Sequence, residues 1–151
     1  MTTSEREDCF GAGRRKDYLG FVGFGIFVLV VGIVFVLNPL LTSEFGFWIE
    51  QMTTAQELVR PPQGLIASAI VFFGLIGVSD FFVAGVRVWV EKSGRRALGD
   101  VLTGVAILLF AYLISLYESY SIAGLMVLGT EAIAVGLLIV LYSIVKVAFR
   151  K

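Results

Sequence analysis

Four long runs of hydrophobic residues, separated by short polar stretches, dominate the sequence. They cover about residues 18–41, 63–90, 97–117 and 121–147. Each run is long enough to cross the ~30 Å hydrocarbon layer of a bilayer, which takes about 20 residues as a helix. The runs lack the alternation of a β-barrel strand. We therefore predict an all-α, polytopic membrane protein with four transmembrane helices arranged as two antiparallel hairpins.

The segment between the first two runs, about residues 43–60, has a different pattern. Its apolar side chains recur at helical spacing and share one face: Phe45, Trp48, Ile49, Met52 and Val59. Acidic and other polar residues fill much of the rest. This pattern predicts a short amphipathic helix that lies at the outer membrane interface. The alternative is a loop whose aromatic residues pack on the helices.

Basic residues are concentrated in three polar stretches, at residues 1–17, 92–96 and 146–151. Four spans place all three stretches on one side, and Arg60 is the only basic residue on the other. Because basic residues favour the cytoplasmic side, we predict a cell-membrane protein whose N- and C-termini are both cytoplasmic. Residues 1–17 form a polar tail, and residues 18–151 form a single transmembrane domain.

The composition supports this class and excludes several others. Of the 151 residues, 58% are hydrophobic and only 16% are charged, and the formal net charge is zero. A soluble domain is about 25% charged. Histidine is absent and Cys9 is the only cysteine, which argues against a Ser-His-Asp triad, zinc sets and internal disulfides.

The sequence also lacks motifs for catalysis, metal binding and nucleotide binding. No nucleophile–base set, metal-ligand set or phosphate-binding loop is visible, since the glycines at 11 and 13 are not followed by the P-loop lysine. The zero net charge gives no reason to expect nucleic acid. We therefore expect no enzymatic activity, no cofactor or metal, and neither nucleic acid nor a nucleotide as a partner.

Two carboxylic acids lie inside the apolar runs, Asp80 in the second and Glu131 near the centre of the fourth. A charge at the centre of a spanning helix costs about 2.5–3.5 kcal/mol, so such groups face protein or water and often serve a function. One interpretation is a proton or cation site, in which the two acids could share one proton. The other is hydrogen bonding between helices. Both interpretations stay open.

Arg87 and Asp100 lie at equal distances along the chain on either side of the turn at Ser93-Gly94. An antiparallel hairpin brings such positions to the same depth, so we predict a charge-assisted pair between them. Arg96 is a second candidate partner for Asp100, because the two are four residues apart on one helix. We interpret this group as a structural clamp of the hairpin.

The function expected from these features is that of a non-catalytic accessory, assembly or scaffold component of a membrane complex. The alternative is a small proton- or cation-coupled transporter or channel that uses Asp80 and Glu131. Small residues in the spans allow close helix contacts. Besides the lipid bilayer, we therefore expect further copies of the chain or a larger membrane complex as partners.

Overall fold

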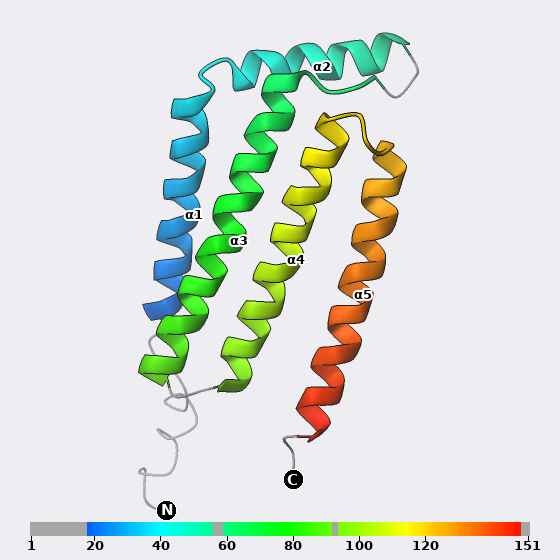
Figure 1. Cartoon of the computed structure of the whole chain (residues 1–151). Coiled ribbons are helices and arrows are strands. Elements are labelled where there is room, and N and C mark those ends of the chain that lie inside the picture. The colour runs from blue at the N-terminus through cyan, green and yellow to red at the C-terminus, as the bar shows by residue number, and fades with distance from the viewer. Residues whose placement is uncertain (1–17, 56–58, 92–93, 149–151) are drawn as a thin grey trace, which may run out of the picture.

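The computed structural model describes residues 18–55, 59–91 and 94–148 of the chain. These residues form helices and connecting turns, so the predicted all-α class is confirmed. The described helices are α1 (Tyr18–Leu37), α2 (Leu41–Ala55), α3 (Gln63–Glu91), α4 (Gly94–Glu118) and α5 (Gly124–Ala148), as labelled in Figure 1.

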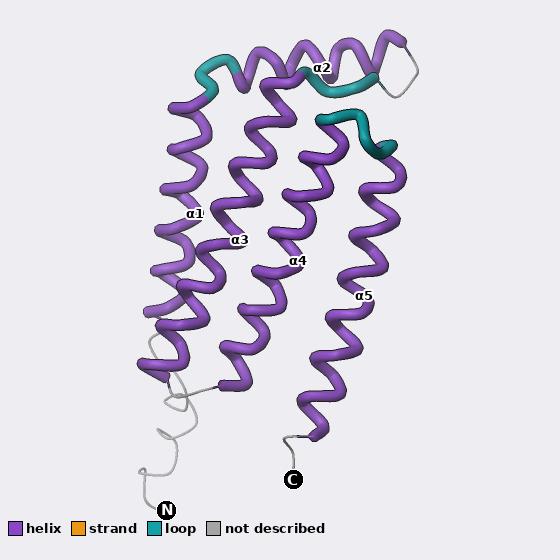
Figure 2. Tube along the Cα trace, in the orientation of Figure 1, coloured by secondary structure: helices purple, strands orange, loops and turns teal. Residues whose placement is uncertain are grey.

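Four of the helices run side by side in a single row, in the order α1, α3, α4, α5 (Figures 1 and 2). Each packs on its neighbour in that row, and the contact between α3 and α4 is the most extensive. Helix α2 crosses one end of the row at 82° to α1 and contacts α3. We call this end, which also holds the turn between α4 and α5, the α2 end. The opposite end, where α1 starts and α5 finishes, is the tail end.

Three helices are long and apolar enough to cross a membrane, through residues 63–89, 97–118 and 124–147. A fourth span is counted if α1 and α2, which are separated by the sharp bend, are taken together as one broken span. The chain is therefore a helical protein with three to four segments suited to a membrane.

Helix α1 ends at Leu37, somewhat before the predicted limit near residue 41. The reason is local, because Pro39 cannot donate a hydrogen bond to a continuing helix. The side chain of Asn38 accepts a hydrogen bond from the backbone of Leu40 at 3.2 Å, and the backbone of Leu41 donates to the Asn38 carbonyl at 3.1 Å. These two bonds turn the chain into α2.

Helix α2 occupies the segment in which the sequence pattern predicted a helix, but it is described only as far as Ala55. Residues 56–58 lie outside the described residues, and 59–62 form an extended link into α3. The indole of Trp48 donates a hydrogen bond to the carbonyl of Val59 at 2.8 Å. This bond fastens the link to α2.

The closest approach in the row is between α3 and α4, at Gly77 and Gly104. A Cβ added to Gly104 would lie 2.9 Å from the carbonyl oxygen of Gly77. Both positions therefore need glycine for the two backbones to approach this closely. Nearby, Phe73 and Phe110 pack edge to face with their ring centroids 4.9 Å apart. The α3–α4 contact is thus the packed centre of the molecule.

Candidate functional site

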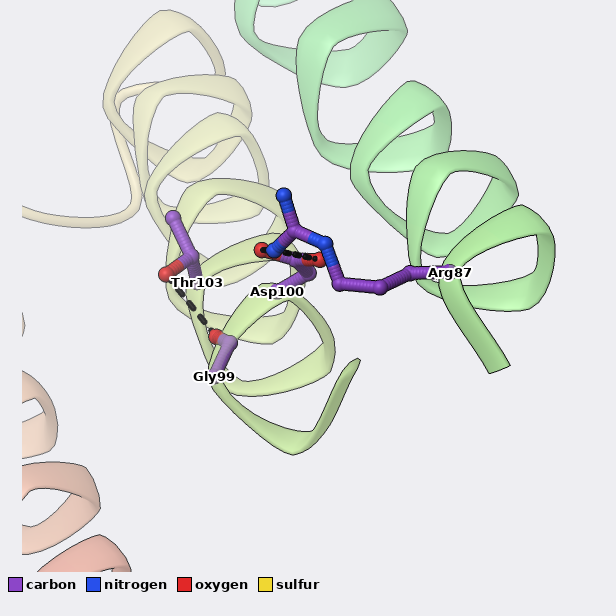
Figure 3. Close-up of polar contacts among 4 residues, drawn as sticks. All are labelled: Arg87, Gly99, Asp100 and Thr103. Carbon is purple, nitrogen blue, oxygen red and sulfur yellow. Dashed lines mark hydrogen bonds and ion pairs between the residues drawn. The ribbon is translucent and has the colours of Figure 1, made fainter. Parts of the chain in front are cut away.

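The predicted pair between Arg87 on α3 and Asp100 on α4 is present (Figure 3). Nη1 of Arg87 donates to both carboxylate oxygens of Asp100, at 2.7 Å and 2.6 Å. Each side chain is 23% exposed. The pair therefore joins the two helices in a partly shielded position near the tail end. The predicted contribution of Arg96 concerns a side chain outside the described part of the structure.

Asp80 lies on the face of α3 that packs against α4. Its Cβ is 3.1 Å from the position that a Cβ on Gly104 would take. Asp100 is one helical turn from Gly104 on α4. Asp80 is half-buried and makes no hydrogen bond with the described residues. Its carboxyl group therefore belongs to the tight α3–α4 contact, close to the clamp between Arg87 and Asp100.

Glu131 lies on the face of α5 that is turned toward α4. The less exposed positions of α5 recur at helical spacing and include Val127, Ala134, Val135 and Leu138. Glu131 belongs to this stripe. Its Oε2 atom is buried and has no hydrogen-bond partner in the structure. An unpaired buried acceptor is costly, so this atom is unusual among the polar groups of the described helices.

The structure places Asp80 and Glu131 on different faces of α4. Asp80 meets α4 at Gly104, whereas the grooves shared by α4 and α5 are lined on α4 by other positions, including Thr103, Ala106 and Phe110. A whole helix thus lies between the two acids. This arrangement gives no support to a proton shared directly between them.

Arg60 makes several contacts at the α2 end, where the sequence alone indicates only that it is an isolated basic residue. Nη2 of Arg60 donates to the backbone carbonyls of Tyr117 and Glu118, at 2.8 Å and 2.9 Å. These carbonyls belong to the last turn of α4, where carbonyl groups have no partner within the helix. The carbonyl of Tyr117 also accepts a hydrogen bond from the backbone of Tyr120 at 3.1 Å. The guanidinium also stacks on aromatic rings, with its Cζ 3.4 Å from the ring centroid of Tyr120 and 4.8 Å from that of Tyr117.

A second polar cluster holds the bend between α1 and α2 against α3. Nδ2 of Asn38 donates to Glu44 at 3.2 Å and to Ser68 at 3.1 Å. The hydroxyl of Ser68, which is only 8% exposed, donates in turn to the carbonyl of Gly64 at 2.7 Å. The carboxylate of Glu44 lies directly over Gly64, near the start of α3. Negative charge is favourable at the start of a helix.

Two grooves separate α4 from α5. One, of about 420 Å³, lies toward the tail end and is lined by residues that include Gly99, Ala106 and Tyr142. The other, of about 740 Å³, lies toward the α2 end and reaches α3. Its lining includes Trp48 and Phe110. Both linings are almost entirely apolar, so they offer surfaces for packing more than sites for polar chemistry.

No group of three or more His, Cys, Asp or Glu side chains that could hold a metal ion occurs in residues 18–55, 59–91 and 94–148. No family model, no curated protein and no solved structure matches the chain. The argument for function therefore rests on the arrangement of the helices and on the polar groups just described.

Proposed function

We propose that the protein is a non-catalytic accessory or assembly component of a membrane complex. The observation that carries this proposal is the open row of helices. Helices α1 and α5 each pack on a single neighbour in the row, and both present exposed apolar side chains, such as Phe21 and Leu125, each 81% exposed. Such edges can face lipid, and they can equally receive another membrane helix.

The proposal includes a topology. The four helices of the row cross the cell membrane as two antiparallel hairpins, and both termini are cytoplasmic. Helix α2 lies as an amphipathic helix on the outer interface. Support comes from the common location of the start of α1 and the end of α5 at the tail end (Figure 1). The basic stretches of the sequence flank the helix ends that meet there, and Arg60 alone lies at the α2 end.

The arrangement of the intramembrane acids also supports an accessory role over transport. A transport path needs polar groups in succession, whereas α4 separates Asp80 from Glu131. Asp80 is built into the α3–α4 contact beside Gly104, where backbones approach too closely for a passage. The polar groups of the spans thus fit a role in holding helices together.

The test compares assembly and ion flux for the same preparation. We expect the protein, extracted in a mild detergent, to migrate with other membrane proteins or further copies, and to give no proton flux in proteoliposomes. Ile133→Trp, at a 68% exposed position of α5, should release the partner if α5 is the docking edge. Val105→Trp on α4, at a 40% exposed position in mid-row, is the matched control. A single chain in detergent with robust wild-type flux would overturn the proposal.

One observation favours a second candidate function, a proton- or cation-coupled transporter or channel. The buried Oε2 of Glu131 has no partner in the structure, and such an atom is suited to take up a proton or a cation. If this function holds, Glu131→Gln abolishes flux in proteoliposomes and leaves the assembly intact. Asp80→Asn, measured in the same flux and assembly assays, tests the role of the other acid separately. It removes a charge from the α3–α4 contact without changing the side-chain volume.

A further inference from the structure

The groove of about 740 Å³ near the α2 end is shaped by residues from four helices and the link into α3. Its lining includes Trp48, Leu65, Phe110, Tyr117, Val127 and Leu128. Six residues of α4 separate Tyr117 from Phe110, which corresponds to about 10 Å along the helix axis at 1.5 Å per residue. The groove is therefore elongated and apolar, and it follows α4 from the α2 end toward the middle of the row.

Arg60 lies at the mouth of this groove, because Val59 and Pro61 on either side of it both belong to the lining. A guanidinium carries five N–H donors. The two on Nη2 are satisfied by the carbonyls of Tyr117 and Glu118. The three on Nε and Nη1 make no hydrogen bond with the described residues. A fixed cation with unused donors thus stands where an apolar groove begins.

This combination matches one class of ligand. Phosphate oxygens are strong acceptors for guanidinium donors, and an acyl chain fits an apolar groove that runs along a helix. The charges around Arg60 narrow the class further. In the sequence from residue 41 to residue 62 and from 118 to 123, Arg60 is the only basic residue, while Glu44, Glu50, Glu57 and Glu118 are acidic. A headgroup with both a phosphate and an ammonium group complements this surface.

We propose that a zwitterionic phospholipid is bound at this site, with its phosphate on Arg60 and one acyl chain in the groove between α4 and α5. Tyr117 and Tyr120 hold the guanidinium in place by stacking on it. The hydrogen bond from Trp48 to Val59 fixes the link that carries Arg60. The lipid fills the space between α5 and its neighbours and ties α5 to the α2 end.

Lipid retention tests this proposal directly. The full chain is purified in a mild detergent, delipidated, and incubated with palmitoyl-oleoyl phosphatidylethanolamine or with the diacylglycerol of the same acyl chains. Bound lipid per chain is measured by native mass spectrometry. We expect about one phospholipid on the wild type, and affinity about tenfold lower for Arg60→Gln, because one charge-assisted interaction is lost. Diacylglycerol has no phosphate group. The wild type should therefore bind it as weakly as Arg60→Gln binds the phospholipid.

A second variant keeps the test valid if Arg60→Gln does not fold. Leu128→Trp fills the groove at a 61% exposed position and leaves Arg60 intact, so it should also lower retention severalfold. Two variants outside the groove are controls: Lys146→Gln for the loss of a charge and Leu141→Trp for added bulk. Both should retain as much phospholipid per chain as the wild type. Unchanged retention in Leu128→Trp, or equal binding of diacylglycerol and phospholipid to the wild type, would overturn the proposal.

Discussion

The pair between Arg87 and Asp100 gives the sharpest quantitative prediction. Its hydrogen bonds are short, at 2.6 Å and 2.7 Å, and both side chains are 23% exposed. Exposed ion pairs contribute about 0–1 kcal/mol, whereas hydrogen bonds to charged groups in shielded positions contribute about 1.5–3 kcal/mol. The partial shielding and the short distances place the interaction at about 2 kcal/mol.

A double-mutant cycle measures this interaction separately from other contacts of the two residues. Arg87→Gln, Asp100→Asn and the double variant are unfolded by denaturant titration in mixed micelles, and the free energies of unfolding are compared. We expect each single variant to lose about 2 kcal/mol and the double variant to lose little more, because the second substitution removes a group already without its partner.

The control is Lys146→Gln, which removes an exposed charge at the end of α5. It should change the free energy of unfolding by less than about 0.5 kcal/mol. If the losses of the two single variants simply add, to within about 0.5 kcal/mol, the pair is not a clamp. The interpretation of the α3–α4 contact as ionically fastened would then be wrong.

Three further predictions follow from the packing and the topology. Gly104→Ala should destabilise the protein by about 1–3 kcal/mol because the new Cβ meets backbone, whereas Gly136→Ala, with open space around it, should be neutral or stabilising in a chemical-denaturation assay. Trp48→Phe removes one hydrogen bond, which costs about 0.5–1.5 kcal/mol, and limited proteolysis should then cut the link into α3 faster. In a chain whose native cysteine is replaced, a membrane-impermeant thiol reagent added to intact cells should label Ser121→Cys and spare Lys146→Cys; the reverse pattern refutes the orientation.

Local signals explain which parts of the structure the sequence could predict. Arg87 and Asp100 were found because the sequence predicts that only a short turn separates their helices, so equal distances along the chain imply equal depth. The end of α1 was approximately predicted, since the first hydrophobic run stops near residue 41 and the helix ends at Leu37. In both cases the decisive interaction involves residues close together in the sequence.

The row of helices could not be predicted in the same way. Helices that are apolar on every side carry no stripe that shows which neighbour they face, so nothing in the sequence separated a row from a closed bundle. The partners of Arg60 lie almost sixty residues away and are backbone carbonyls, which have no side-chain signature. Its isolation among acidic residues was the only available signal, and it indicated orientation without indicating a contact.

The single-row arrangement has a consequence for how the molecule is made. In such a layer each helix depends only on adjacent helices, as repeats do in a solenoid. Of the described helices, α1 is synthesised first, but its neighbour in the row, α3, is complete only at residue 91. The close contact of α3 with α4 must await residue 118. The contact of α1 with α3 can therefore form before the α3–α4 contact is complete, and α5 is the last helix to join the row.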